Sequence, residues 1–185
     1  MIEGDKRIRL KFEDRGAFDT RIWVGGDVLI FHMHTNVFQI APHNTLWQSS
    51  YLKKNPEMGY CGIINVYNFL ADSLEYNRVN DSGYLIARIL VNVEDHFMVQ
   101  AKKIFGFDYQ NFINNKLDQD TIEKLIEQII MQALGFEMYV PPFDQVQLVK
   151  VHEMRKLSSN LQLKTGKRLG FKFQAEEGSI GDFNP

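Results

Sequence analysis

The sequence predicts an α+β domain, built from a mostly antiparallel β-sheet of hairpins packed by one long helix and one short helix. Three observations lead to this fold class. β-prone runs follow one another with only short polar turns between them, and a single long amphipathic helical pattern comes late in the chain. The strand–helix–strand alternation that is typical of a parallel sheet is missing from the pattern.

The N-terminal part of the chain is expected to form strands. Residues 7–12 alternate basic with apolar side chains, which is the period of a strand with one face in water. Gly25 and Gly26 separate two β-rich runs, and glycine tolerates the positive φ that tight hairpin turns need. The second run extends over residues 28–40, and the His-Thr-Asn segment at 34–36 is expected to turn it back on itself.

A short helix is expected near residues 45–54, laid over the sheet by its aromatic side. Trp47 and Tyr51 are one helical turn apart, and Pro56 would end the segment. β character returns from about Gly59 to Leu70.

The hairpin that follows turns at residues 93–95, and its own pattern predicts the register. A three-residue loop places Val91 opposite Phe97 and Ile89 opposite Val99, so that one face is wholly apolar. A two-residue loop mixes apolar with polar partners, and we therefore expect the three-residue loop. The other face is then mixed, and its polar members are Arg88, Asn92, His96 and Gln100.

The long helix is expected over residues 120–134, with Asp120 as its N-cap and Glu123 completing the reciprocal capping pattern. Gly135 is expected to supply the left-handed C-terminal end. A wide apolar stripe must be buried, and the sheet is the available surface. The stripe consists of Ile122, Leu125, Ile126, Ile129, Ile130, Ala133 and Leu134.

The 185 residues are expected to form one α+β core domain, residues 1–143, with a basic C-terminal extension and tail, residues 144–185, packed on the same domain. Residues 145–173 hold seven Lys or Arg against one Glu, whereas the whole chain has a net charge of −2. The start of this segment, residues 145–154, fits either a strand or a helix, and we favour a strand followed by a helix. "YVPPF" (139–143) reads as a rigid link and "GSIGDFNP" (178–185) as a tail.

Composition favours a cytoplasmic protein. Hydrophobic residues make up 44% of the chain, as in ordinary globular proteins, and Cys61 is the only cysteine, so no intramolecular disulfide can form. No signal peptide is visible in the charged first residues, and no apolar run approaches the roughly 20 residues of a membrane helix. A partner in the membrane is therefore not expected.

Two histidines, His32 and His34, lie two residues apart in a β-prone run and so share one face of a strand. Their spacing from Gly26 and to Gln39 resembles the first metal-binding motif of the cupins, over about 14 residues. That resemblance implies a metal site. The chain departs from the motif at Gln39, where cupins have a glutamate, and at Leu46, where they have a glycine, and it has no match to the second cupin motif.

We expect His32 and His34 to be strand residues that hold no metal. A structural zinc site needs four ligands and a catalytic one normally needs three plus water. The sequence offers two histidine ligands at a defined spacing. His43 or His96 could complete a set of metal ligands only if the fold brought them close to this pair. "HEMRK" (152–156) lacks the second histidine of the zinc-protease motif.

The absence of a complete catalytic set favours a non-enzymatic, cytoplasmic ligand- or protein-binding module with a sensory or regulatory role and no cofactor. Homodimerisation is expected, because a semi-apolar second sheet face is usually covered. One alternative is a metal-dependent enzyme built on the cupin-like His-x-His pair, and a second is nucleic-acid binding through residues 150–172, which we do not expect. The expected ligand pocket lies on the mixed sheet face and consists of His32, His34, Arg88, His96 and Gln100.

Overall fold

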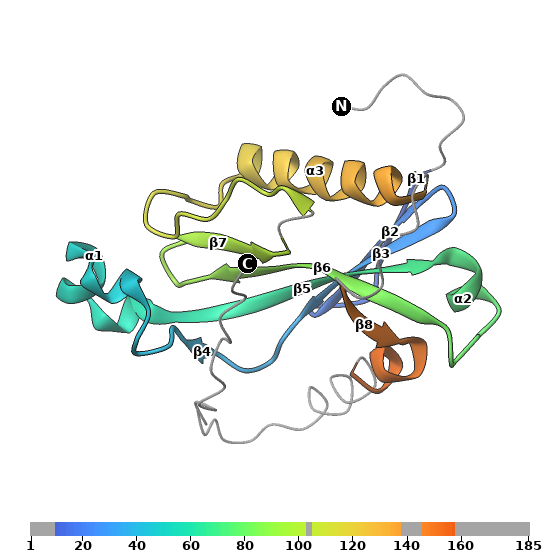
Figure 1. Ribbon diagram of the computed structural model, residues 1–185, viewed down its shortest axis with the longest axis horizontal. Coiled ribbons are helices and arrows are strands. Elements are labelled where there is room, and N and C mark those ends of the chain that lie inside the picture. The colour runs from blue at the N-terminus through green and yellow to red at the C-terminus, as the bar shows by residue number, and fades with distance from the viewer. Residues whose placement is uncertain (1–9, 103–104, 138–145, 158–185) are drawn as a thin grey trace.

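A computed structural model describes residues 10–102, 105–137 and 146–157 of the chain. They form an antiparallel sheet of eight strands with helices packed on it, as the predicted α+β class requires (Figure 1). The main strand order is β1-β2-β3-β5-β6-β7; in addition β4 pairs with β5, and β8 pairs with β6.

Four strands come first in chain order, and helical segments separate the later strands except β6 and β7. The strands are β1 (Leu10–Asp14), β2 (Asp19–Val24), β3 (Asp27–Met33), β4 (Phe38–Gln39), β5 (Tyr60–Leu70), β6 (Ser82–Val91), β7 (Phe97–Ala101) and β8 (Gln147–Lys150). The helices are α1 (Ser50–Lys54), α2 (Ala71–Glu75) and α3 (Gln119–Glu137), with 3₁₀ turns at Thr45–Gln48 and Pro56–Gly59.

The hairpin between β2 and β3 is confirmed. Val24 pairs with Asp27 across a two-residue loop. Gly25 in this loop has φ +58°, a conformation that suits glycine and that gives the turn the twist of the flanking strands.

The expected reversal at residues 34–36 is wrong. β3 and β4 both pair antiparallel with β5, along residues 64–70 and 60–61 respectively, so the chain bends at 34–36 and continues in the same direction. The long strand β5 therefore serves as the template for both halves of the run 28–40. The His-Thr-Asn segment at 34–36 therefore marks a bend between β3 and β4 and not a hairpin.

The short helical segment forms where the sequence predicts it. Asn44 caps the 3₁₀ turn by accepting from the N–H of Leu46 at 2.9 Å, and Ser49 caps α1 by accepting from the N–H of Leu52 at 3.3 Å. Trp47 and Tyr51 pack against the sheet. Residues 45–54 therefore cover one end of it.

The β6–β7 hairpin has the predicted three-residue register. Val91 pairs with Phe97 and Ile89 with Val99, and the N–H of Asn92 donates to the carbonyl of His96 at 3.0 Å. The side chain of Asn92 also accepts from the N–H of His96 at 2.9 Å, which holds the loop closed.

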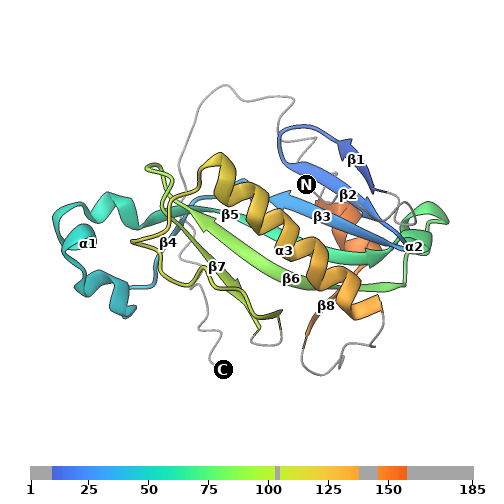
Figure 2. The ribbon, with the colours of Figure 1, turned by 90° about the horizontal axis from the view of Figure 1, so that it is seen from above.

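The long helix α3 lies diagonally across one face of the sheet (Figure 2). Its buried stripe is narrower than predicted, because Ile122 is exposed while Leu125, Ile129, Ile130 and Ala133 are buried. We refer to the covered side as the α3 face.

Both predicted ends of α3 are wrong. Asp118 is the N-cap, because its carboxylate accepts from the N–H of Thr121 at 2.8 Å. Hydrogen bonds from the side chain of Thr121 and, to a lesser extent, from its backbone N–H lower the pKa of Asp118. The helix also continues past Gly135 to Glu137, so Gly135 is an interior residue. Asp118 lies directly before the helix and Asp120 lies in its first turn, and the backbone rather than the residue type decides which of them caps it.

The beginning of the C-terminal extension packs on the sheet. β8 pairs with the first half of β6, and residues 151–157 are helical, as the strand-then-helix prediction requires. The predicted rigid link at 139–143 and the tail at 178–185 lie outside the described residues.

The second face, opposite α3, carries two separate apolar clusters. One lies beneath α2 and the helical residues 151–154, and its buried members are Val28, Ile30, Tyr67, Phe69, Leu85, Val151 and Met154. The other lies beneath the segment around α1, and its buried members are Ile40, Leu52, Cys61, Ile63, Leu90 and Phe112.

The first strand differs from its predicted burial. Leu10 and Phe12 sit opposite Val24 and Ile22, on the α3 face, yet they are 49% and 67% exposed. α3 does not extend over β1 (Figure 2), so the apolar side of this edge strand remains in solvent.

Ile89 tests the α3 face. It is 5% exposed in the core beneath α3, and Ile89→Ala should lower the free energy of unfolding by about 2–5 kcal/mol in urea denaturation. Val93 at the tip of the same hairpin is 79% exposed, and Val93→Ala should change the free energy of unfolding by less than about 0.5 kcal/mol. Equal effects of the two substitutions would contradict this assignment of the core.

Candidate functional site

Five polar side chains form one row across the second face. From β2 to β7 the row, which we call the polar row, consists of Asp19, His32, Asn65, Arg88 and Gln100. Each is paired directly with the next in the strand registers, and paired residues of antiparallel strands project from the same face. The five side chains therefore lie side by side.

The polar row separates the two apolar clusters of the second face. On β5, Asn65 lies between Ile63, which belongs to the cluster near α1, and Tyr67, which belongs to the cluster near residues 151–154. Residues two apart on a strand share a face, so the polar row is a polar seam between two apolar surfaces.

His32 is the most enclosed histidine of the predicted site, at 2% exposure. Neither of its ring nitrogens has a hydrogen-bond partner among the described residues. A neutral imidazole offers one donor and one acceptor, and leaving a buried group of this kind unpaired costs roughly 1–3 kcal/mol. His32 therefore has capacity for two hydrogen bonds that the fold leaves unused.

Burial lowers the pKa of His32 below its ordinary value, because the charged imidazolium loses hydration. The negative charge of Asp19 opposes this effect, and the neighbouring His34 adds to it. The ring is accordingly held toward its neutral form, which can donate and accept at the same time.

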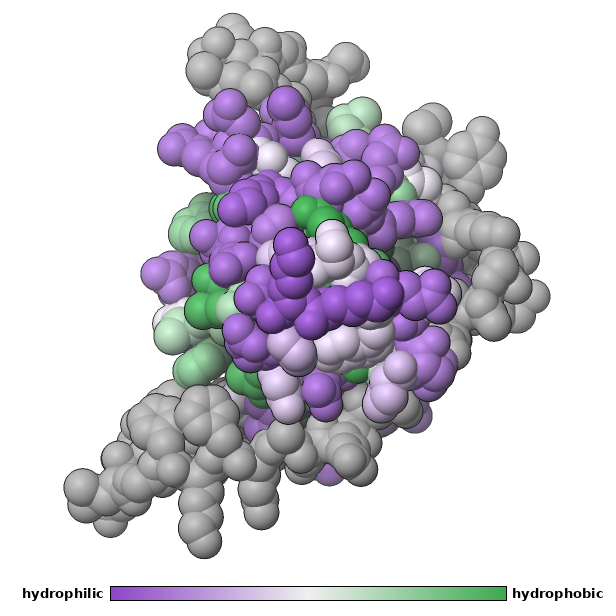
Figure 3. All heavy atoms as spheres, turned by 90° about the vertical axis from the view of Figure 1, so that its left-hand side faces the viewer, coloured by the Kyte–Doolittle hydropathy of each residue, from purple (hydrophilic) through white to green (hydrophobic). Residues whose placement is uncertain are grey.

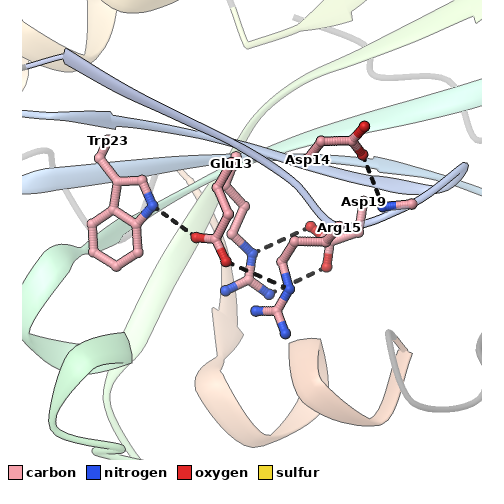
Figure 4. A network of polar contacts seen from close by, with 7 residues as sticks. Glu13, Asp14, Arg15, Asp19 and Trp23 are labelled. Carbon is pink, nitrogen blue, oxygen red and sulfur yellow. Dashed lines mark hydrogen bonds and ion pairs between the residues drawn. The ribbon is translucent and has the colours of Figure 1, made fainter.

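The carboxylate of Asp19 is held by Arg21. The Arg21 guanidinium donates from Nε to Oδ1 and from Nη2 to Oδ2, both at 3.2 Å, and both residues are less than 10% exposed (Figure 4). This forked pairing balances the charge at the β2 end of the polar row. It also occupies the carboxylate that would otherwise be the base beside His32.

The other end of the polar row is cationic. Arg88 is half-buried and donates from Nη2 to the side-chain oxygen of Gln147 at 3.3 Å. Burial raises the pKa of Tyr67, and the positive charge of Arg88 opposes that rise. The charge of Arg88 therefore also acts on Tyr67, which lies two residues beyond Asn65 on β5. Gln100 lies beside Arg88, and its Oε1 atom is buried with no hydrogen-bond partner in the described structure.

Of the predicted site residues, His32, Arg88 and Gln100 come together in the polar row. His34 adjoins it, directly after β3, with its N–H donating to the carbonyl of Ile63 at 2.8 Å. Its Nδ1 accepts from the N–H of Asn36 at 3.1 Å, and its ring contacts Phe38 edge-on at 4.8 Å.

His96 lies apart from the polar row. It is on the same face, but Met98 separates it from Gln100 along the chain, and its ring lies against Tyr51 at a centroid distance of 4.7 Å. Its Nδ1 is buried without a partner among the described residues. The tip of the hairpin is thus part of the apolar cluster near α1, and the predicted five-residue pocket divides into two places.

Two members of the polar row, Asp19 and Asn65, were missed from the sequence. Asp19 opens a strand, and Asn65 is one of two asparagines, with Asn68, in an otherwise mostly apolar strand. The signal that could have found Asn65 is an amide within an apolar run, because an amide in a buried strand needs partners. Its alignment with His32 and Arg88 depends on which strands pair, and a single strand does not carry that information.

The described residues do not form the metal centre that the cupin resemblance implies. No group of three or more His, Cys, Asp or Glu is placed to hold an ion within these ranges. Gln39, at the position of the cupin glutamate, lies on β4 opposite Tyr60. Cys61 is fully buried, and burial raises its pKa to about 12, so it remains a thiol at neutral pH and is a poor nucleophile.

A shallow surface depression of about 520 Å³ lies away from the polar row. It is lined by Thr45, Leu46, Ser49, Gln110, Asn111 and Ile113. The end of the molecule that carries α1 presents mainly hydrophilic side chains (Figure 3). This depression brings together no charged side chain and offers weaker chemistry than the polar row.

Comparisons of the chain with models of known protein families, with curated proteins and with solved structures found no match. Within the described ranges, no helix combines the length and hydrophobicity needed to cross a membrane. Of the basic segment 150–172, the structure describes residues 150–157 only.

The free energy of unfolding should fall as the pH drops below 6.5, the ordinary pKa of histidine. The pKa of His32 is lower in the folded protein than in the unfolded chain, so the unfolded chain binds this proton more readily. The stability that neutral His32 contributes is complete above pH 6.5 and is lost as the pH falls toward the folded pKa, by at most about 1.4 kcal/mol per pH unit.

Urea denaturation of the wild type and of His32→Gln between about pH 5 and pH 8 measures this effect. The variant should show a weaker dependence on pH below 6.5. If the free energy of unfolding depended on pH in the same way in both proteins, His32 would not be the source of this pH dependence.

Proposed function

We propose that the protein is a non-enzymatic, cytoplasmic binding module that takes a small polar ligand at the polar row and has a sensory or regulatory role. The observation that carries the proposal is His32, which is buried at 2% exposure with both ring nitrogens unpaired among the described residues. Buried polar groups are nearly always hydrogen-bonded, so an unpaired imidazole in a row of polar side chains supports a partner supplied by a ligand.

The polar row favours a ligand that carries an anionic group and a hydrogen-bond donor. Arg88 supplies a positive charge that suits a carboxylate or another small oxyanion. The unpaired Oε1 of Gln100 is an acceptor and would take a donor such as an amide or ammonium group. Neutral His32 can serve either kind of group.

A binding role without catalysis agrees with the chemistry of these side chains. Asp19, the carboxylate nearest to His32 in the strand register, is held in the forked pair with Arg21. Cys61 is buried as a thiol on the far side of Ile63. A nucleophile activated by a neighbouring base is therefore not assembled along the polar row. A single buried cysteine also suits the reducing cytoplasm.

A panel of acetate, phosphate, succinate, glutamate and glutamine tests the proposal, with thermal unfolding and calorimetry as readouts. At least one compound should bind, and at about 100 times its Kd it should stabilise the fold by about 2.7 kcal/mol. His32→Phe, which keeps a ring of similar bulk without its nitrogens, should abolish the effect. Arg88→Gln should weaken the binding of the anionic compounds more than that of glutamine, which retains a carboxylate but has lower charge than glutamate.

His43→Phe and Arg78→Gln are the matched controls, because both residues are exposed and lie outside the polar row. They should bind like the wild type. Binding that survives His32→Phe, or no binding by any member of the panel at millimolar concentration, would contradict the proposal.

A further inference from the structure

The strand β1 lies at one edge of the sheet in the part of the chain that the structure describes. Among the described residues it pairs with β2 alone, along Leu10–Asp14. An edge strand carries unpaired N–H and C=O groups along its outer side and is a template on which another strand can add.

The hairpin geometry determines which residues of β1 direct their backbone outward. In the two-residue hairpin, even-numbered residues of β2 bond to β3, and the chain continues this pattern at Phe18, whose carbonyl accepts from the N–H of Met33 at 2.9 Å. Odd-numbered residues of β2 therefore bond to β1, as the 3.0 Å bond from the N–H of Arg15 to the carbonyl of Asp19 shows. It follows that Leu10, Phe12 and Asp14 present their backbone groups to the open edge.

The apolar side of the same edge is exposed. Phe12 is 67% exposed and Leu10 is 49% exposed, both on the α3 face but beyond the reach of α3 (Figure 2). A solvent-exposed Phe beside unpaired backbone groups is the pattern of an edge that is covered in an assembly.

The other side of β1 carries two opposite charges two residues apart, Lys11 and Glu13, and both side chains contact Trp23. The Trp23 Nε1 donates to Glu13 at 3.0 Å, and the Lys11 Nζ lies 5.4 Å from the centre of the indole ring (Figure 4 shows the Glu13 contact). Arg15 lies 3.8 Å from the same carboxylate. The positions of the two charges on the strand are thereby set before any partner arrives.

These charges select one register for pairing β1 with a second β1 in antiparallel orientation. Centring the pair on Lys11 places two lysines opposite each other, and centring it on Glu13 places two glutamates opposite each other; both arrangements are unfavourable. Centring on Phe12 places Lys11 of each chain opposite Glu13 of the other. Phe12 then lies opposite Phe12 of the second copy, and the outward backbone groups of these two residues form a hydrogen-bonded pair. The Lys11–Glu13 pairs on either side are non-hydrogen-bonded pairs, in which the side chains of the two strands come closest.

We propose that β1 pairs with β1 of a second copy of this chain about a two-fold axis at Phe12, so that the two sheets join into one. The sequence predicts a homodimer, and it placed the contact on the second face. The β1 edge is a better surface, because its charges are self-complementary and its Phe12 is exposed. This arrangement also leaves the polar row outside the interface, so the dimer and the ligand site are independent.

The interface is small, since it rests on one short strand from each copy, and we expect a dissociation constant in the micromolar range, about 1–100 μM. Sedimentation of the full chain over about 1–500 μM should show a reversible change from the 21.6 kDa monomer to a species of twice that mass.

A charge-swap cycle tests the register. Lys11→Glu and Glu13→Lys should each weaken self-association about tenfold or more, because like charges then face each other. The double variant, and an equimolar mixture of the two single variants, should recover dimers with near wild-type affinity. Lys54→Glu, an exposed lysine on α1 with the same change in charge, is the control and should dimerise normally.

Thermal unfolding of each variant separates loss of pairing from damage to the β1–β2 hairpin, because Lys11 and Glu13 also contact Trp23. Phe12→Cys gives a second readout that does not depend on charge. It should form an intermolecular disulfide readily, since hydrogen-bonded partners across antiparallel strands have Cα atoms about 5.5 Å apart, within disulfide range. Cys61 is fully buried and does not compete.

A wild-type protein that stays monomeric at the highest concentration would overturn the proposal. So would dimers that both single charge variants form as well as the wild type, or a Phe12→Cys variant that crosslinks no faster than Lys54→Cys. None of these results bears on ligand binding at the polar row.

Discussion

The antiparallel pairing of β5 with β6 is the constraint on which the rest of the structure depends. These two long strands lie at the centre of the sheet, and every strand except β1 and β2 pairs with one of them. Their register places Asn65 opposite Arg88. Because β3 and β7 pair with the outer sides of the same two strands, this one alignment brings residues from far apart in the sequence into the polar row.

The two faces of the sheet have different roles as a result. α3 closes one face over the largest of the three apolar clusters, and the burial of such apolar surface is the main favourable term in folding. The other face holds two smaller apolar clusters with the polar row between them. A polar seam of this kind reduces the apolar area that the face can bury, and a ligand that uses the unpaired nitrogens of His32 would offset that loss.

The sequence predicted what local patterns determine. The α+β class, the Gly25–Gly26 hairpin and the register of β6 with β7 follow from alternation and turn chemistry within about twenty residues. The polar row needed pairings between strands more than thirty residues apart, such as His32 with Asn65, and no local pattern sets these. The helix cap was mistaken because Asp118 and Asp120 both suit that role, and the hydrogen bond from Thr121 decides for Asp118.

The nitrogen resonances of the His32 ring test the central claim most directly. A long-range ¹H–¹⁵N spectrum at neutral pH, assigned with His32→Gln, reports whether the ring is neutral and whether its nitrogens are bonded. The account predicts a neutral ring, with one protonated and one bare nitrogen, whose signals move when a ligand saturates the polar row. A charged imidazolium at neutral pH, or signals that stay in place while a ligand binds, would contradict it.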